Sequence, residues 1–354
     1  MRLLVFALGA TLHLTFFSFR ERIRVAGSPL THDRVVGLAQ ELRNVPEICG
    51  LSFFELATVL GLYAFECEEV EVAVYRSGVL GGRLDATNVI HPEITAITNV
   101  ALDHSDYLGN SLSEIAREKL GIVKSGVPLI TTESDEDLLE IFREVTRDVG
   151  VPCLKANEPE PDRIDVNPDR TRFTLETSAW GQIEIETPLV GRHQARNAAL
   201  AVEILQHMPE DLRPELETLR TGIAAVEHYG RNQIEVINGR VWFFDVAHNV
   251  AGMDSLVDTI DSLDFPRPLV ALVGVLGDKD WRNMLSALLS RMDRAILTQA
   301  PSAPLDRRWK PEDAFQTLER IVNLELRKIS KKRWYKPEVM RGRVLCLLRG
   351  RCTL

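Results

Sequence analysis

The stretch Gly78–Gly126 constrains the fold more than any other part of the chain, because it joins a glycine turn, an apolar run and a capped helix. The apolar run, Ile94–Leu102, is typical of a strand that is covered on both faces of a sheet. Ser111 and Glu114 form a capping box, so the sequence predicts a helix that begins at Leu112. A strand and a helix in this order indicate a βαβ unit.

Polar residues with potential chemistry follow this strand. The strand ends at Asp103 and His104, and ligands in open α/β sheets bind beyond the carboxyl ends of strands. The apolar stripe of the next helix includes Lys119, which predicts that its ammonium group lies on the packed side. A lysine in such a place loses its charge easily and becomes a nucleophilic amine. Lys124, near the helix end, is expected to face solvent.

Strands and helices alternate from Met1 to Glu227, which predicts a mainly parallel sheet with helices on both faces. The predicted strands are Val70–Tyr75, Ile94–Leu102 and Val127–Thr132, and the predicted helices are His32–Leu42, Phe53–Phe65, Leu112–Gly121 and Asp135–Asp148. Between residues 156 and 187 the strings RFTLET and QIEIET alternate with period two, which predicts a small antiparallel sheet.

A second strand–helix pattern begins after Arg231. Its predicted elements are strand Val241–Asp245, helix Ala251–Ser262, strand Leu269–Val275, helix Trp281–Met292 and strand Ala295–Thr298. We therefore expect two domains, 1–228 and 232–320. Residues 321–354 hold ten basic residues against two acidic ones. This stretch is expected to be either a divergent tail without function or a basic tail for RNA or anionic surfaces.

Composition narrows the class of protein. The 354 residues are 45% hydrophobic and 26% charged, as in an ordinary soluble globular protein, and the net charge of −9 argues against a nucleic-acid binder. Five scattered cysteines without a CxxC pair indicate neither a disulfide framework nor a zinc site, and predict a cytoplasmic protein. The apolar N-terminal run is short for a membrane helix, so we expect a buried strand rather than a secretory signal or an anchor.

Several strings, in this order, resemble the folylpolyglutamate synthase / dihydrofolate synthase family of the Mur ligase superfamily. They are RERIRVAG, LSFFELAT, GGRLDATN, LDHSDYLG, GRHQARNAALA, FDVAHNVAG and GVLGDKD. The resemblance covers roughly Leu12 to Thr298. It implies an α/β fold with a Mur-ligase-like ATPase domain, whose phosphate-loop sheet is incomplete here, and a smaller Rossmann-like C-terminal domain. It also implies an ATP-dependent ligase that adds L-glutamate to folate or dihydropteroate through an acyl phosphate. Such an enzyme is expected to be a monomer that binds neither nucleic acid nor membrane.

The resemblance further implies ATP and Mg²⁺ as cofactors. His104 matches the family's metal-binding histidine, although it could instead only cap its strand. Lys119 matches the lysine that the family carbamylates with CO₂ to hold a metal, although its head could instead reach solvent along a packed stem. Thr11 could stand for the serine that binds the metal in the family's phosphate loop. Asp103 either orients His104 or accepts main-chain N–H bonds.

In the second domain the resemblance assigns residues to the nucleotide. Asp245 and His248 match the D-x-A-H-N motif, which contacts nucleotide and lines the cleft between the domains. Arg231 matches a linker arginine that reaches ATP. Asn197 is the better nucleotide candidate at the start of its helix, because His193 could equally be a core residue.

Folate binding is expected from a turn and a helix start. Arg83 and Asp85 belong to a tight glycine turn that either approaches substrate or is only structural. Phe53 and Phe54 begin a helix and are either core residues or groups that stack on a pterin. Finally, His104, Lys119, Asp245 and His248 are predicted to face one cavity between the domains.

The sequence departs from the family in two places. The string G-x-x-x-x-G-K-[ST] does not occur in the 354 residues, so we expect an N-terminally truncated chain. Ser77 stands where the family has a metal-binding glutamate, beside Arg76, and neither residue replaces a carboxylate. We therefore expect no measurable ATP turnover by this chain alone. Two alternatives follow, a non-catalytic remnant that binds folate or nucleotide, and another Mur-type amide ligase.

Overall fold

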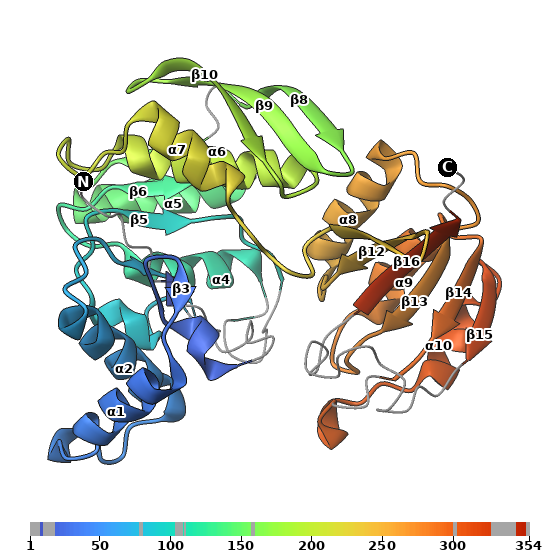
Figure 1. The fold of residues 1–354 in the computed structure, drawn as a ribbon, viewed down its shortest axis with the longest axis horizontal. Helices are drawn as coiled ribbons and strands as arrows, with labels where there is room; N and C mark the ends of the chain where they lie inside the picture. Colours follow the sequence, from blue (N-terminus) through green and yellow to red (C-terminus); the bar gives the residue numbers. More distant parts are fainter. Residues whose placement is uncertain are drawn as a thin grey trace. The chain divides into compact units, whose positions relative to one another are not determined.

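The computed structural model describes residues 8–9, 18–77, 81–102, 109, 111–156, 160–299, 303–326 and 345–351 (Figure 1). The chain divides into two compact units. The first holds residues 1–129 and 134–153, and the second holds 130–133 and 154–354. The predicted boundary at 228–232 lies within the second unit. The small antiparallel sheet and the helices after it therefore belong to the same unit as the C-terminal strands.

The first unit is helix-rich, with short strands. Its α-helices are α1 (His32–Leu42), α2 (Phe53–Cys67), α4 (Leu112–Lys119) and α5 (Glu136–Val149), and its 3₁₀ helices are η2 (Phe19–Arg22), η3 (Pro46–Ile48), η4 (Ala86–Val89) and η5 (Leu120–Ile122). The strands of this unit are β1 (Leu8–Gly9), β2 (Arg24–Val25), β3 (Ser28–Pro29), β4 (Val74–Tyr75) and β5 (Thr95–Ile97). β1 pairs with β4 in parallel, and β2 pairs with β3 antiparallel.

Strand β5 corrects one prediction. It forms a three-stranded sheet in the order β5-β6-β7 with β6 (Leu129–Thr131) and β7 (Cys153–Lys155), and the division between the units passes through β6 and β7. Thr95 and Ile97 are buried but Ala96 is exposed, and Leu102 is 58% exposed. Within the described residues only one face of β5 is therefore covered, because residues of a strand alternate between the two faces.

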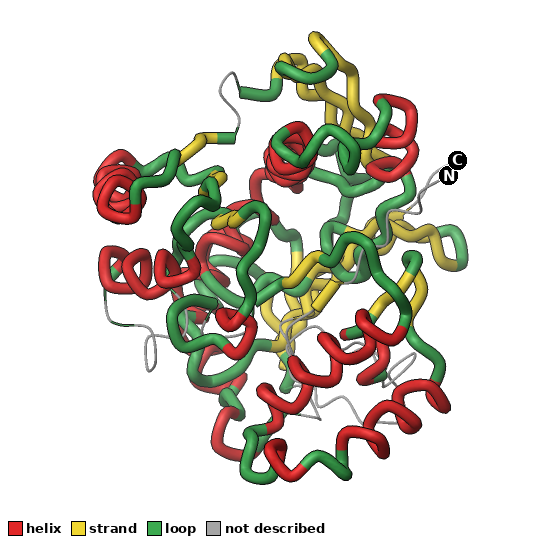
Figure 2. Tube along the Cα trace, turned by 90° about the vertical axis from the view of Figure 1, so that its left-hand side faces the viewer, coloured by secondary structure: helices red, strands yellow, loops and turns green. Residues whose placement is uncertain are grey.

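The second unit begins with the predicted antiparallel sheet, which the structure confirms. β8 (Asp162–Asn167), β9 (Arg170–Thr177) and β10 (Gly181–Thr187) pair antiparallel in sequence order. α6 (Arg192–Gln206) and α7 (Leu216–Ala224) share a buried apolar cluster with these strands, and Figures 1 and 2 show both helices beside the sheet. The alternation of buried Phe173 and Leu175 with half-buried residues supplies the apolar face on which the helices pack.

The strand–helix pattern restarts after Arg231, as predicted. The elements are β11 (Gln233–Ile237), β12 (Arg240–Asp245), α8 (Val250–Ser262), β13 (Val270–Gly274), α9 (Trp281–Leu289), β14 (Arg294–Leu297), η6 (Leu305–Arg307), α10 (Pro311–Leu318), β15 (Asn323–Leu326) and β16 (Leu345–Arg351). β11 and β12 form a hairpin, whose turn residues Asn238 and Gly239 both have the positive φ that such a turn requires (52° and 66°).

The six strands of this region form one sheet in the order β11-β12-β16-β13-β14-β15. β13, β14 and β15 are parallel, whereas β16 runs antiparallel between β12 and β13. This arrangement corrects the prediction that residues 321–354 are a tail, since β15 and β16 are strands of the sheet. The apolar run VLCLL within this stretch has the composition of a strand, and the surrounding basic residues obscured it.

Two further observations concern the length of the apolar helices and the state of the cysteines. None of the helices in the described residues is long and apolar enough to cross a bilayer. Cys49, Cys67 and Cys153 are free cysteines. The burial of Cys153 raises the pKa of its thiol, which keeps that side chain neutral and unreactive.

Candidate functional site

In the first unit, the glycine turn and the end of α4 interlock. The N–H of Arg83 donates to the carbonyl of Glu118 over 3.0 Å. A Cβ atom on Gly82 would lie 2.1 Å from that carbonyl oxygen, and a Cβ on Gly121 would lie 2.5 Å from the Cβ of Arg83. Only glycine allows the two main chains this close approach. The turn therefore fixes the position of the last turn of α4, which carries Lys119.

The polar residues of the turn bond within it. Asp85 caps η4, and its carboxylate accepts the N–H groups of Gly81 and Thr87 at 3.2 and 3.0 Å. The side-chain amide of Asn88 donates to the carbonyl of Arg83 in the turn and to the carbonyl of Gly121 after α4. Lys124 is half-buried and donates from Nζ to the carbonyl of Asn88 over 3.0 Å, so the prediction that it faces solvent is wrong. These contacts support the structural interpretation of the turn.

Two cationic side chains project from this assembly. The side chain of Arg83 is 64% exposed and pairs with the carboxylate of Glu118, which is only 17% exposed (Nε–Oε2 3.4 Å). Lys119 is half-buried in the last turn of α4. The arginine is therefore accessible to an anionic ligand, while the position of the ammonium group of Lys119 on the packed side of the helix stays a prediction.

The aromatic start of α2 lies on the surface. Phe53 is 55% exposed and Phe54 is 44% exposed, so the interpretation of these rings as core residues is wrong. The ring of Phe53 meets the rings of Phe54 and Phe19 edge-on, each at 6.1 Å between centroids. The guanidinium of Arg22 lies over Phe19 and Phe53 at 5.5 and 5.9 Å, and burial lowers its pKa to about 10. The cluster therefore leaves aromatic surface exposed to solvent beside a cationic group.

In the second unit, Asp245 ends β12 and is buried. Its two carboxylate oxygens accept the N–H groups of Asn232 and Ala247 over 2.9 and 2.7 Å. Burial raises the pKa of Asp245, and these two bonds together with the charge of Arg231 partly offset that rise. The bonds fix both oxygens, so the direction of the carboxyl group is set by the main chain.

Arg231 lies within electrostatic reach of both Asp245 and His193. Burial, assisted by the charges of Arg231 and Arg196, lowers the pKa of His193 to about 4 against the opposing charge of Asp258. Nε2 of the neutral ring accepts from the amide of Gln194 over 3.0 Å. Asn197, the predicted nucleotide ligand, is exposed on the next turn of α6 and donates to the oxygen of that same amide over 3.1 Å.

His248 follows Asp245 at the carboxyl end of β12. Its Nδ1 lies 3.2 Å from the carbonyl of Val246, which can only accept, so Nδ1 carries the proton. The histidine also acts on the carboxyl group of Asp245, whose pKa it lowers when charged. α8 begins directly afterwards, where Asn249 accepts the N–H of Gly252 over 2.8 Å. Arg231, Asp245, His248 and His193 therefore form one cluster.

Comparison with known proteins gives the family. Residues 63–205 match the family described as Mur ligase middle domain, and residues 230–333 match Mur ligase, glutamate ligase domain. The folylpolyglutamate synthase of Lacticaseibacillus casei is 29% identical over 310 residues, which are 85% of this chain and 71% of that protein. The dihydrofolate synthase/folylpolyglutamate synthase of Escherichia coli is 31% identical over 276 residues, 78% of this chain and 62% of that protein.

Solved structures agree with these matches. The Mycobacterium tuberculosis folylpolyglutamate synthase complexed with ADP superposes with a TM-score of 0.79 at 26% identity, covering 92% of this chain and 74% of that one. The Escherichia coli FolC in complex with DHPP and ADP gives 0.75 at 28% identity, with coverages of 92% and 73%.

The chain belongs to the folylpolyglutamate synthase / dihydrofolate synthase family. The predicted family and α/β fold class are thereby confirmed. The chain spans about two thirds of the length of the relatives that it matches, between 61% and 71% for those from Lacticaseibacillus casei, Bacillus subtilis, Mycobacterium tuberculosis and Escherichia coli.

The structure describes only some of the residues that the family resemblance assigns to the site. His104 and Thr11 lie outside the described residues, and the convergence of His104 and Lys119 with Asp245 and His248 stays a prediction. Within the described ranges, no group of three or more His, Cys, Asp or Glu side chains could hold a metal ion.

Sequence reasoning missed the buried contacts around Arg231. The missed residues are Val190, Gly191, Asn232 and Thr259, which bond to or pack against one another. The sequence signal was weak, because an asparagine directly after Gly-Arg is a hint of left-handed backbone and nothing more.

Proposed function

We propose that this chain binds ATP and takes part in the ligation of L-glutamate to the carboxyl group of folate or dihydropteroate. The observation that carries the proposal is the cluster of Arg231, Asp245 and His248 at the carboxyl end of β12, in a chain of this family. Such strand ends are where open α/β sheets hold their ligands. Relatives with this fold have been solved with ADP, which supports a nucleotide at this cluster.

The proposed reaction has two steps. The folate carboxylate first takes the γ-phosphoryl group of ATP, which gives an acyl phosphate and ADP. The amine of glutamate then attacks the acyl carbon, the bond from that carbon to the phosphate oxygen breaks, and the amine loses a proton as the amide forms. Both steps bring anions together, so cationic groups near the phosphates lower the barrier. Arg231 would supply such a charge, with its direction set by Asp245.

We further propose Mg²⁺ as the cofactor, with His104, Thr11 and a carbamylated Lys119 as its ligands. A metal ion of this kind supplies positive charge to the phosphate oxygens. The support from this chain is the half-buried position of Lys119, whose helix end is fixed by Gly82. The proposed folate groups are Phe53 and Phe54 for a pterin ring, with Arg83 and Asp85 near the substrate. The exposure of the two rings and of Arg83 supports these assignments.

A second function follows from a sequence departure. Arg76 and Ser77 stand where the resemblance implies a carboxylate that binds the metal ion, and neither side chain replaces it. This departure favours a protein that binds nucleotide or folate without turnover.

One experiment separates the two functions. ADP affinity is measured by calorimetry, and ATP-dependent incorporation of labelled glutamate into dihydropteroate or tetrahydrofolate is measured on the same preparation. The variant is Arg231→Gln, and the control is Arg163→Gln, whose side chain is 82% exposed. Binding and incorporation that both fall only in Arg231→Gln support the ligase. ADP binding without incorporation supports the second function, and the absence of both overturns the two proposals.

A further inference from the structure

Asn232 has an unusual backbone conformation in a buried place. Its φ is +44° and only 1% of the residue is exposed. Gly230, two residues earlier, also has a positive φ of 67°, so Arg231 lies between two left-handed residues. Non-glycine residues rarely adopt this conformation, although asparagine tolerates it better than most. Both ends of the arginine's main chain are therefore fixed.

Three hydrogen bonds hold Asn232 in this conformation. Its N–H donates to Oδ2 of Asp245 over 2.9 Å, and its Nδ2 donates over 2.9 Å both to the carbonyl of Val190 and to Oγ1 of Thr259. A carbonyl can only accept, so the amide orientation is determined. Thr259 gives its own proton to the carbonyl of Ser255 and accepts from the amide.

Gly191, the residue after Val190, packs against Thr259 and His193. Gly191 has a φ of 124°, and a Cβ atom there would lie 2.7 Å from both Oγ1 of Thr259 and Cε1 of His193. The contact therefore has no free space, and it joins the start of α6 to α8. Oδ1 of Asn232 is also buried and has no hydrogen-bond partner among the described residues. A buried amide with one unpaired oxygen costs free energy, which points to a role for its other atoms.

We propose that Asn232 is a positioning residue, which holds Arg231 between the carboxyl group of Asp245 and the imidazole of His193 and ties that arrangement to the start of α6. The residue does not itself touch the reacting atoms. Its effect on catalysis rests on the proposed nucleotide role of Arg231, whereas its effect on the position of Arg231 requires no ligand.

The first test therefore uses no nucleotide. The titration of His193 is followed by NMR on the full chain, with the resonance assigned by its loss in His193→Gln. Arg231, Arg196 and Asp258 are the charges that act on this ring. The variant Asn232→Gly keeps the left-handed conformation and removes only the side chain. The control is Asn238→Gly, at an exposed asparagine whose φ is 52°.

We expect Arg231→Gln to raise the pKa of His193 from about 4 towards its usual range, since a positive neighbour is lost. Asn232→Gly should reproduce most of this shift, and Asn238→Gly should leave the titration unchanged. If Arg231→Gln moves the titration and Asn232→Gly does not, the proposal is wrong. It is also wrong if Arg231→Gln has no effect, or if Asn238→Gly has the same effect as Asn232→Gly.

A milder variant covers the case in which Asn232→Gly fails to fold. Thr259→Val removes one acceptor of the amide and preserves the shape of the side chain, so it should shift His193 in the same direction by a smaller amount. No shift in a folded Thr259→Val, where Arg231→Gln does shift the ring, would contradict the proposal.

ADP affinity then links the position to function. Asn232→Gly should weaken ADP binding about tenfold, which is roughly 1.4 kcal/mol. The variant should still unfold cooperatively, with a melting temperature close to that of the wild type. A chain that binds no ADP overturns the proposed function, and the titration of His193 still decides the role of Asn232.

Discussion

The two units hold their cationic residues in different ways. In the first, Lys119 is placed by a contact between Gly82 and the carbonyl of Glu118, which is close because glycine has no side chain. In the second, Arg231 is placed by the hydrogen bonds of Asn232 and Asp245, all of them buried. The first contact thus depends on the absence of atoms, and the second depends on particular donors and acceptors.

This difference predicts opposite sensitivities. Adding a single methyl group should break the contact in the first unit, while the second should tolerate glycine in place of Asn232 with its conformation kept and its bonds lost. The effect of a variant in the first unit should therefore appear in the free energy of unfolding. The effect of a variant in the second unit should appear in the pKa of a neighbouring group, because the hydrogen bonds there position charges. Four variants test these expectations, from the largest effect to the smallest.

The largest effect is expected from Gly82→Ala. Its Cβ would lie 2.1 Å from the oxygen and 2.6 Å from the carbon of the Glu118 carbonyl, and main-chain atoms cannot move aside cheaply. We expect a loss of about 3 kcal/mol in the free energy of unfolding, measured by urea denaturation. The control is Gly37→Ala in α1, where a Cβ meets nothing within 4 Å and where alanine should stabilise the helix by about 0.5–1 kcal/mol. Equal stability of the two variants would show that the close contact is unimportant.

The next effect is a change in pH dependence in the second unit. The pKa of His193 is lowered from 6.5 to about 4 in the folded chain, so the unfolded chain binds its proton more tightly. The contribution of His193 to stability is therefore complete above pH 6.5 and is lost as the pH falls towards 4, by up to about 3 kcal/mol.

His193→Gln should remove this dependence. The free energy of unfolding of the wild type should fall more steeply between pH 6.5 and 4 than that of the variant. Asp245 acts in the opposite sense, because its raised pKa lowers stability as the pH rises, and it is common to both chains. Parallel curves for the wild type and the variant would show that the ring of His193 is not buried in solution.

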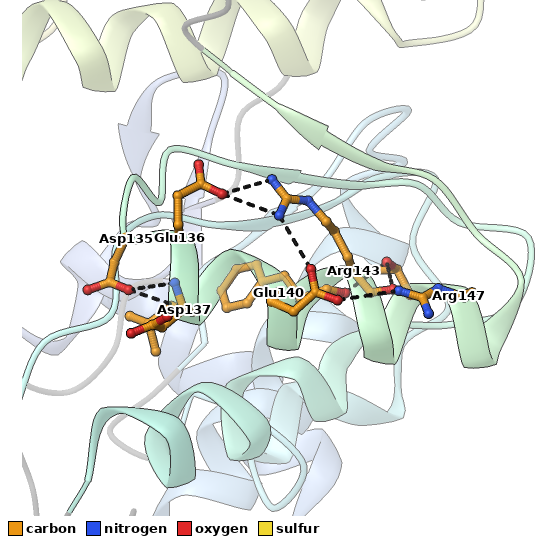
Figure 3. A network of polar contacts seen from close by, with 9 residues as sticks. Asp135, Glu136, Asp137, Glu140, Arg143 and Arg147 are labelled. Atoms are coloured by element: carbon orange, nitrogen blue, oxygen red, sulfur yellow. Dashed lines mark hydrogen bonds and ion pairs between the residues drawn. The ribbon is translucent and has the colours of Figure 1, made fainter.

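The smallest effects are expected on the exposed face of α5, shown in Figure 3. Asp135 caps this helix by accepting the N–H groups of Asp137 and Leu138, so Asp135→Ala should cost about 1 kcal/mol. Arg143 pairs with Glu136 and Glu140 across open surface, and Arg143→Ala should leave the melting temperature unchanged, since solvent screens exposed ion pairs. A larger loss in Arg143→Ala than in Asp135→Ala would reverse this order.

Local signals in the sequence predicted much of the fold. The predicted helix His32–Leu42 has the same bounds as α1, and the capping box of Ser111 and Glu114 is present in the structure. These features depend on residues that are close in sequence, so a single sequence carries them. The D-x-A-H-N string likewise placed Asp245 at a strand end.

Contacts between distant residues could not be predicted in this way. Asn232 bonds to Val190, 42 positions away, and to Thr259, 27 positions away, and no local pattern records either partner. The exposure of Phe53 and Phe54 depends on what packs near the start of α2, which periodicity alone does not reveal. β16 was missed because charge was counted over the whole stretch and its short apolar run was not considered separately.

The position of β16 has a consequence for how the second unit folds. Its residues pair with β12 and β13, so Cys346 must find Asp245 across about a hundred intervening residues. Contacts between such distant segments form slowly, because a long loop must close before the pairing stabilises it. During synthesis, the edges of β12 and β13 remain unpaired until residues 345–351 leave the ribosome. In that interval the half-formed sheet exposes two strand edges that can pair with other chains, which makes chaperone binding useful at this stage.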